Sequence, residues 1–425
     1  MKNSLQAIKG MADVLPKDSA LLEELEHIVS EVFRSYGYRN MRTPVPEPTA
    51  LFSRGIGDAT DIVEKEMYSF EDSMNGDKIT LRPEATAGLV RAAIEHNLTY
   101  GAPQRIWTVG PMYRHEKPQK GRLRQFHQFD VECFGYEGPD VDAEIILMLA
   151  RIWEELGIAD SVRLEINSIG NAEERKAHRE KLVAYFNEHK ALLDEDSLRR
   201  LERNPLRILD SKNPAMQAML NAAPTLLQSL GQESLAHFEA FKALLGNAGI
   251  DYSVNPRIVR GMDYYNRTVF EWVTDKLGSQ GTICGGGRYD GLFELLGGKP
   301  TPSIGFGMGV ERVLLLMQAC GAEAEHNTDA YIVHNHIAQA QTLAEYLRDE
   351  GLNIIVNAGG GKFAAQMKRA DAANAYFALI LGEDEIANQQ VTVKTLQSGE
   401  QTTLPLADLS DYLLQMLAQD YDDAQ

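Results

Sequence analysis

The chain has 425 residues, of which 44% are hydrophobic and 24% are charged, a composition that suits two or three soluble domains with full cores. Its formal net charge of -19 argues against a protein that grips nucleic acid through a generally basic surface, because affinity for phosphates comes mainly from released counterions. Its three cysteines, Cys133, Cys284 and Cys320, form no CxxC pair, and no apolar run has the length of a signal-peptide core or a membrane span. We therefore expect a cytoplasmic protein with no disulfide framework, no zinc cluster and no membrane contact.

The first hundred residues predict a helix and several strands. Apolar residues recur at spacings of three and four from about Asp18 to Tyr36, which predicts an amphipathic helix. Prolines in the segment 38–47 exclude a helix there and favour an edge strand. A loop from Arg54 to Gly57 follows, and then two alternating runs, MYSF and KITLRPE. Together these elements predict an α+β domain built on an antiparallel sheet.

The run TLRPEATAG leads into the next predicted helix, ATAGLVRAAIEH. Glu84 and Thr86 stand at its start, where polar side chains commonly cap the free backbone N–H groups. The same two side chains could instead face a ligand, and both readings stay open.

The most informative segment is 105–134, in which two alternating runs flank a short loop crowded with Arg, Lys and His. This pattern predicts an antiparallel strand pair with a basic tip. Counting by twos places Arg124, Gln128 and Glu132 on one face of the return strand and apolar residues on the other. Because buried charges need partners, the polar face predicts a charged ligand, and a solvated sheet face is the alternative.

Residues 171–255 are charged and helical in period, which predicts an inserted helical module. Strand signals resume after it, and in the run VRGMDYYNRT Arg260 precedes two tyrosines. This grouping suits a pocket for an anion and a ring, although a plain β-hairpin would look the same. In residues 326–425 strands and helices alternate, which predicts a compact α/β domain.

The glycine-rich run GFGMGVERV leads into a predicted helix whose first turn offers Glu311 and Arg312. Glycines permit close backbone approach, and the helix dipole together with Arg312 favours a phosphate. With Arg114 and Arg260 this makes three separated arginines, which suit a polyphosphate together with a carboxylate. In such chemistry the nucleophile is already ionised, so catalysis lies in neutralising charge. The sequence has no phosphate-loop, HExxH or GxGxxG motif, and we expect no metal held by a dedicated protein site.

These blocks closely resemble the histidyl-tRNA synthetases of the bacterial type, which are class II aminoacyl-tRNA synthetases, and the match runs essentially end to end. The most specific blocks are LRPEATAG, RQFHQFDVECFG, VRGMDYYNRTVFEW and CGGGRYDGL. The three weaker class II motifs resemble the segments that end at Glu47, Glu116 and Arg312. The resemblance implies an α+β fold with a class II antiparallel sheet flanked by helices in residues 1–325, a helical insertion at 171–255 and a C-terminal α/β anticodon-binding domain at 326–425.

The resemblance also implies roles for the matched residues. Arg114 and Arg260 would be catalytic and would face the carboxylate of histidine and the α-phosphate of ATP. Histidine would be bound by Glu84, Thr86, Arg114, Gln128, Glu132, Arg260, Tyr264, Tyr265 and Tyr289. ATP would be bound by Arg114, Glu116, Arg122, Arg124, Arg260 and Arg312. Candidates for contact with tRNA are Lys117, Gln119 and Lys120 at the hairpin tip and Lys362, Lys368 and Arg369 in the last domain.

The implied reaction is the activation of L-histidine by ATP with Mg²⁺, followed by transfer to the 3′ end of tRNA(His) by a homodimer. One alternative is a non-catalytic, synthetase-like regulatory subunit of histidine biosynthesis. Such proteins typically lack the anticodon domain and the arginines of the ATP site, which this chain retains. A second alternative is a related ligase that passes its adenylate to a small amine, and the retained hairpin tip and last domain argue against it.

Overall fold

The computed structural model describes most of the chain, and the described residues are 5–57, 60–211, 213–258, 262, 264–278, 281–323 and 328–423, without the side chains of residues 203 and 419–423. The chain divides into two compact units, Met1–Glu323 and Ala324–Gln425, and each is described by itself. Among the helices of the described residues, none is both long and apolar enough to cross a membrane.

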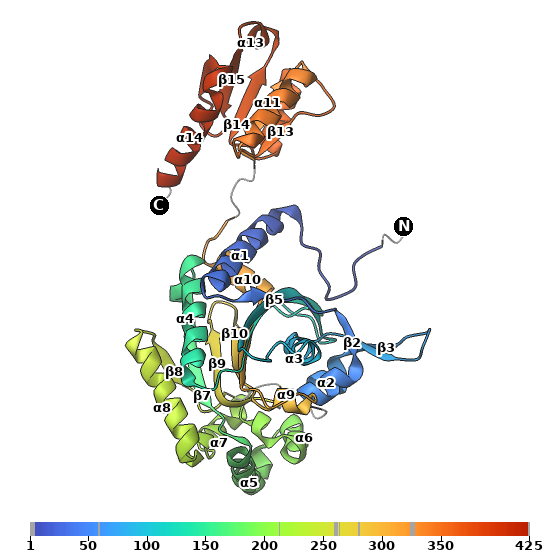
Figure 1. Cartoon of the computed structure of the whole chain (residues 1–425), viewed down its shortest axis with the longest axis vertical. Coiled ribbons are helices and arrows are strands. Elements are labelled where there is room, and N and C mark those ends of the chain that lie inside the picture. Colours follow the sequence, from blue (N-terminus) through green and yellow to red (C-terminus); the bar gives the residue numbers. More distant parts are fainter. Residues whose placement is uncertain are drawn as a thin grey trace. The chain divides into compact units, whose positions relative to one another are not determined.

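A curved eight-stranded sheet lies at the centre of the first unit (Figure 1). Its strands are β1 (Arg39–Asn40), β5 (Gln104–Tyr113), β6 (Gln125–Phe134), β7 (Arg163–Ser168), β8 (Tyr252–Val254), β9 (Asn266–Val273), β10 (Thr282–Arg288) and β11 (Ser303–Gly309). They run in the order β1-β5-β6-β11-β10-β9-β7-β8, and neighbours are antiparallel except in the pairs β1–β5 and β7–β8. The predicted α+β domain on an antiparallel sheet is confirmed.

The predicted hairpin is confirmed as strands β5 and β6, which pair over their whole length. Alternation divides β6 as expected, because Phe129 is fully buried on one face while Gln128 and Glu132 lie on the other. Strand β6 begins one residue after Arg124, so the part of the predicted alternation that includes Arg124 lies outside the strand.

Helices cover both faces of the sheet (Figure 1). They are α1 (Pro16–Ser35), α2 (Thr49–Ile56), α3 (Thr86–Glu95), α4 (Pro139–Glu155), α9 (Leu292–Leu295) and α10 (Val310–Ala319). On one face, Phe33 of α1 packs with its ring centroid 5.4 Å from Trp107 and 5.9 Å from Phe129. On the other face, Phe293 of α9 lies 5.0 Å from Phe134. These two apolar layers hold the hairpin in place.

Two local predictions near the N-terminus need correction. Helix α1 begins at Pro16 and not at Asp18, because proline at the first helical position loses no hydrogen bond. The predicted loop at Arg54 is wrong, since Arg54 lies in α2, whose Phe52 and Ile56 are fully buried. Burial of this apolar side stabilises the helix in spite of the glycine within it.

A separate three-stranded sheet, ordered β2-β4-β3, completes this region. Its strands are β2 (Pro46–Pro48), β3 (Tyr68–Glu71) and β4 (Lys78–Leu81). The proline-containing segment therefore supplies an edge strand, as predicted, and the two alternating runs supply the other strands.

The segment 171–255 is mostly helical, with α5 (Ala172–Glu188), α6 (Glu195–Arg203), α7 (Gln217–Asn221) and α8 (Gln232–Asn247). Asn171 and Glu174 form a reciprocal capping box at the start of α5. The segment has its own apolar cluster, which includes Leu182 and Phe186. It also contains β8, which was not predicted because three residues carry too little alternation to detect.

The second unit holds a five-stranded sheet ordered β13-β12-β14-β15-β16. Its elements are β12 (Ala330–His334), α11 (Ile337–Asp349), β13 (Ile354–Val356), α12 (Phe363–Ala372), β14 (Phe377–Leu381), α13 (Glu383–Ala387), β15 (Gln390–Thr395), β16 (Gln401–Pro405) and α14 (Leu409–Asp423). Leu347 of α11 is buried in one cluster with Phe377 and Leu379 of β14. The predicted α/β alternation is confirmed, with an antiparallel pair added at one edge.

Candidate active site

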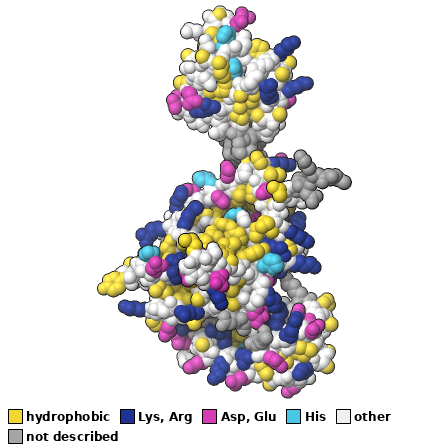
Figure 2. Space-filling view, turned by 90° about the vertical axis from the view of Figure 1, so that its right-hand side faces the viewer, with side chains coloured by type: hydrophobic (Ala, Val, Ile, Leu, Met, Phe, Trp, Pro, Cys, Tyr) yellow, Lys and Arg dark blue, Asp and Glu magenta, His cyan; other side chains and the backbone are white. Residues whose placement is uncertain are grey.

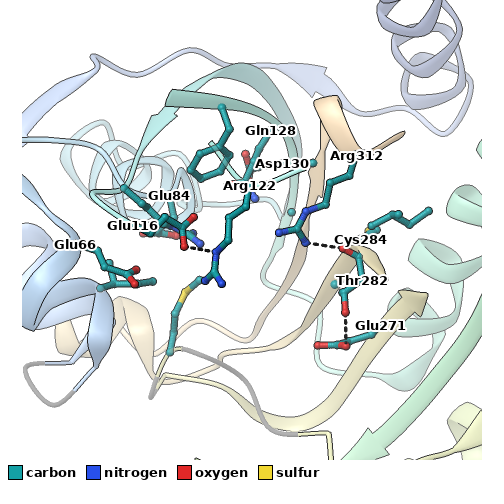
Figure 3. Close-up of a pocket in the computed structure, with 18 of the residues that line it drawn as sticks. Glu66, Glu84, Glu116, Arg122, Gln128, Asp130, Glu271, Thr282, Cys284 and Arg312 are labelled. Atoms are coloured by element: carbon teal, nitrogen blue, oxygen red, sulfur yellow. Dashed lines mark hydrogen bonds and ion pairs between the residues drawn. The ribbon is translucent and has the colours of Figure 1, made fainter. Parts of the chain in front are cut away.

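A cavity of about 340 Å³ opens between the β5–β6 hairpin, the start of α3 and the strands β10 and β11. Figure 3 shows side chains from elements far apart in the sequence converging on this space. The cavity brings together many of the residues that the sequence singled out, namely Glu84, Thr86, Arg114, Glu116, Arg122, Gln128, Tyr264, Tyr265 and Arg312.

Glu132 lies behind Thr86, and its buried carboxylate is held from two sides. The Thr86 hydroxyl group donates a hydrogen bond to Oε1 over 2.6 Å, and the Tyr289 hydroxyl group donates to Oε2. Burial raises the pKa of Glu132 well above its ordinary value, and the two hydrogen bonds oppose this shift. The carboxylate is therefore fixed in position before any ligand binds.

Three tyrosines cluster beside Glu132, and Tyr264 and Tyr265 of these also line the cavity. The ring centroid of Tyr264 lies 4.8 Å from that of Tyr265 and 5.5 Å from that of Tyr289. The Tyr264 hydroxyl group lies 3.5 Å from Oε2 of Glu84. Burial raises the pKa of Tyr264, so this phenol stays protonated and can donate a hydrogen bond.

Glu84 fits both readings that the sequence left open. Its carboxylate accepts hydrogen bonds from the backbone N–H groups of Thr86 at 3.0 Å and Ala87 at 2.9 Å, so it caps helix α3. The same side chain is 3% exposed and lines the cavity. Burial raises the pKa of Glu84, and the N–H group of Ala87 opposes that shift.

Arg114, Arg122 and Arg312 line the cavity together and lie close enough to repel one another. Arg312 donates to the backbone carbonyl oxygens of Thr282 at 2.6 Å and Gly121 at 2.9 Å, and Figure 3 shows it beside Thr282. Burial lowers the pKa of Arg312, and the charges of Arg122 and Arg114 lower it further. A polyanion among these cations would relieve the repulsion.

The other two arginines have different neighbours. Arg114 donates from Nε to the carbonyl oxygen of Pro83 over 2.9 Å, and its guanidinium lies 5.2 Å from the ring centroid of Phe126. Arg122 forms an ion pair with Glu116, drawn as a dashed line in Figure 3. An anionic ligand would compete with Glu116 for Arg122.

Several predicted residues are not part of the cavity lining in the described part of the chain. Arg124 instead connects the hairpin to the N-terminal segment. Its backbone N–H group donates to the carbonyl oxygen of Gly10 at 2.7 Å, and its guanidinium donates to the carbonyl oxygen of Lys9 at 3.4 Å. Arg260 lies outside the described residues. The others that do not line the cavity are Glu132, Tyr289, Lys117, Gln119, Lys120, Lys362, Lys368 and Arg369.

The three basic residues predicted in the second unit lie on or beside α12. Lys362 directly precedes the helix, and Lys368 is exposed on it. Arg369 turns back toward the preceding loop and donates to Oδ1 of Asn357 at 2.8 Å and to the carbonyl oxygen of Gly360 at 2.9 Å. Arg369 therefore also orders the glycine-rich loop.

Asp130 is a buried residue of the cavity that sequence reasoning missed. It is 3% exposed and lines the cavity, and burial together with the negative charge of Glu84 raises its pKa to about 8. The alternation that selected Gln128 and Glu132 also includes Asp130, so a signal was present. Arg82, which is 4% exposed beside Asp130, was missed as well, and no pattern distinguished it.

On the face of the first unit that Figure 2 draws, the basic side chains of the described residues do not form one continuous surface. On the face drawn in Figure 2, Lys and Arg side chains are interspersed with Asp and Glu side chains. Any contact with a nucleic acid on this face therefore depends on local groups of cations.

Comparisons with known proteins cover nearly the whole chain. A sequence model described as histidyl-tRNA synthetase matches residues 10–313, and one described as an anticodon binding domain matches residues 326–416. A relative from Methylobacillus flagellatus, named histidine–tRNA ligase, is 58% identical over 417 residues, which are 97% of this chain and 100% of the relative. A relative of the same name from Bordetella avium is 56% identical over 419 residues, which are 96% of this chain and 97% of that protein.

Among solved structures, this chain is also similar to a histidyl-tRNA synthetase. The apo histidyl-tRNA synthetase of S. aureus is 36% identical, has a TM-score of 0.79, and the match covers 96% of this chain and 100% of that one. An ATP phosphoribosyltransferase regulatory subunit/histidyl-tRNA synthetase from Bacillus halodurans C is 22% identical with a TM-score of 0.61 over 88% of this chain and 96% of that one, which shows a shared fold alone. The predicted fold class, with its C-terminal anticodon-binding domain, is confirmed.

Proposed function

The chain belongs to the histidyl-tRNA synthetase family, and from that premise we propose how its residues divide the work of joining histidine to tRNA. The enzyme is a histidine–tRNA ligase that uses ATP as a substrate. One observation carries the division of roles: a single cavity joins buried carboxylates and tyrosines to three arginines. The first group suits the ammonium and imidazole groups of histidine, and the second suits phosphates.

Histidine would be recognised by the polar face of β6 and the tyrosines. Glu84, Thr86 and Gln128 would hold its α-amino group, while Glu132 and Tyr264 would hydrogen-bond the two imidazole nitrogens. Tyr265 and Tyr289 would wall the pocket. An amino acid without these nitrogens would leave buried polar groups unpaired, and such losses reject a wrong substrate by a factor of about 10⁴ to 10⁵.

ATP would be bound by the arginines. Arg114 and Arg260 would face the carboxylate of histidine and the α-phosphate, where negative charge builds up in the transition state. Arg122 and Arg312 would meet the β- and γ-phosphates, and Glu116 and Arg124 would support the hairpin loop around the nucleotide. Mg²⁺ would enter with ATP, bound mainly through phosphate oxygens and water.

For the second step, the hairpin tip and the last domain would contact tRNA(His). Lys117, Gln119 and Lys120 follow β5 at the tip and would meet the acceptor end. Lys362, Lys368 and Arg369 at α12 would contribute to anticodon binding, where single-stranded bases are read by stacking and hydrogen bonding.

We also propose a cytoplasmic homodimer with a catalytic domain at 1–325, a helical insertion at 171–255 and an anticodon-binding domain at 326–425. Strand β1 supports the dimer, because it is an exposed strand at the edge of the large sheet. Solution mass would test the dimer directly. The regulatory-subunit alternative is disfavoured, because full-length relatives at 56–58% identity are named as ligases.

The decisive experiment is ATP–pyrophosphate exchange with each of the twenty amino acids in turn. We expect exchange with histidine alone. Exchange with a different amino acid, or none with histidine, would refute the substrate assignment. Transfer of labelled histidine to tRNA(His) would then test the second step.

A further inference from the structure

Asp130 is a buried carboxylate that faces the cavity without a partner of its own. Its side chain is 3% exposed, and its Oδ2 atom accepts no hydrogen bond from any residue that the structure describes. The Oε1 atom of Gln128, two positions earlier on the same face of β6, is likewise buried without a donor among those residues. Two adjoining empty acceptors are costly in a folded protein unless a ligand supplies the donors.

The neighbouring strand leaves space beside both acceptors. Gly307 of β11 pairs with Asp130 in the sheet register. A methyl group placed on Gly307 would lie 3.0 Å from Nε2 of Gln128 and 3.1 Å from Oδ1 of Asp130. All three residues line the cavity, and Figure 3 shows Gln128 and Asp130 side by side there. The glycine therefore keeps both polar side chains open to a ligand.

The two arginines that face Asp130 donate their hydrogen bonds to backbone carbonyl groups. Arg82 lies nearby, but its guanidinium donates to the carbonyl oxygens of Pro111 at 3.0 Å and Thr43 at 3.3 Å. Arg114, which approaches from the hairpin, donates to Pro83. The remaining facing groups are carboxylates, Glu84 at the start of α3 and Glu132 on β6 itself, and β11 contributes only glycine at this position.

We propose that Asp130, together with Gln128 and Glu84, binds the α-ammonium group of the substrate histidine, an assignment that rests on the proposed function. An ammonium group carries three N–H donors, which match three side-chain acceptors. Hydrogen bonds from a cation to a carboxylate are about twice as strong as neutral ones. Asp130 is thus a binding residue that adds a second negative charge to the amino-group site.

The same assignment predicts that histidine binding releases a proton from Asp130. In the free protein, burial and Glu84 raise the pKa of Asp130 to about 8, so most molecules carry a proton on Asp130 at pH 7. The bound ammonium group favours the ionised carboxylate. Histidine binding therefore transfers that proton from Asp130 to the solvent, and histidine binds more tightly as the pH rises from about 6 to 8.

The test compares L-histidine with 3-(imidazol-4-yl)propionate, which lacks only the amino group, by isothermal titration calorimetry on the full chain and on Asp130→Asn. We expect the variant to bind L-histidine about ten- to a hundredfold more weakly, because it loses a charge-assisted bond. Its affinity for the deaminated analogue should stay equal to that of the wild type or improve. Equal weakening for both ligands, or none for L-histidine, overturns the proposal.

A second measurement, the number of protons released on binding, uses the wild type alone and needs no variant. Titrations at pH 7 in two buffers of different ionisation enthalpy count the protons released. The analogue lacks the ammonium group that makes the imidazole of histidine less basic, so the imidazole protons that each free ligand carries at pH 7 are measured by titration and subtracted. After that subtraction, L-histidine should release more protons than the analogue. Equal proton release overturns the role of Asp130, whereas a wild type that binds neither ligand overturns the proposed function itself.

Discussion

The hydroxyl group of Tyr289 donates a hydrogen bond to Glu132, and both side chains are no more than 1% exposed. Tyr289→Phe keeps the ring but removes this donor. We expect the free energy of unfolding to fall by about 1–3 kcal/mol, because a buried acceptor loses a partner. Urea denaturation of the full chain measures the change. Tyr100→Phe, at a side chain 85% exposed, is the matched control and should stay within about 0.5 kcal/mol of the wild type. If the two variants are equally stable, the hydrogen bond contributes nothing.

Arg312→Gln should leave the protein folded but slow histidine-dependent pyrophosphate exchange by a factor of about 10² to 10³. The reason is that Arg312 is held in the cavity by two backbone carbonyl groups, next to two other arginines. Arg199→Gln, at a side chain 68% exposed on α6, is the control and should exchange at the wild-type rate. An unchanged rate for Arg312→Gln at saturating ATP would exclude it from the phosphate site.

Arg260→His tests the arginine that, with Arg114, is proposed to face the carboxylate of histidine and the α-phosphate of ATP. We expect a folded protein in which adenylate formation slows by about two orders of magnitude or more, because a permanent cation is lost where charge accumulates. Single-turnover measurements of adenylate separate this step from tRNA transfer. A rate close to that of the wild type would remove Arg260 from the mechanism.

His178 predicts a dependence of stability on pH. It is buried in α5, and burial, together with the charge of Lys181, lowers its pKa from an ordinary value near 6.5 to about 4. The unfolded chain therefore takes up a proton before the folded one does, so this contribution is complete above pH 6.5 and is lost as the pH falls toward 4. Relative to wild type, His178→Gln should flatten the dependence of unfolding free energy on pH by about 2–3 kcal/mol across that window. His96→Gln, at an exposed histidine, is the control. Parallel pH profiles for His178→Gln and the wild type would contradict the argument.

Gly305 tests how closely the strands approach beside the candidate site. Gly305 lies opposite Glu132 in the register of β11 and β6, and an added methyl group would overlap the Glu132 carboxylate and the Val131 carbonyl group. Gly305→Ala should therefore destabilise the fold by at least about 2 kcal/mol in urea denaturation. Gly246→Ala in α8 has open space around it and should instead stabilise by about 0.4–1 kcal/mol. Equal stability of the two variants would show that the strands can separate at no cost.

The parts of the fold that could be predicted from sequence are those with a local periodic signal. The alternation through Gln128 and Glu132 predicted β6 and its polar face, and the structure confirms both. The spacing of apolar residues predicted α1, and the glycine run predicted a strand that leads directly into α10. In β6 and α1 the apolar side chains that make the pattern are the ones that become buried.

The features that were missed depend on tertiary contacts. Arg54 reads as part of a loop because Gly55 is close, yet α2 forms because its apolar side is buried. Strand β8 exists only as a partner for β7. Asp130 looks like one more polar residue on an alternating strand, and its significance depends on Gly307 and Glu84, which are distant in sequence. No periodicity encodes such neighbours.

The hydrogen bond from the backbone N–H group of Arg124 to the carbonyl group of Gly10 holds the N-terminal segment against the hairpin loop. Gly10 has a φ of +90°, and a side chain there would lie 2.7 Å from Cγ of Pro118, so the leader of the chain fits closely against the loop that would hold ATP and the acceptor end. A substitution at Gly10 would therefore displace this segment from the loop and alter kinetics, although no residue of the cavity is changed.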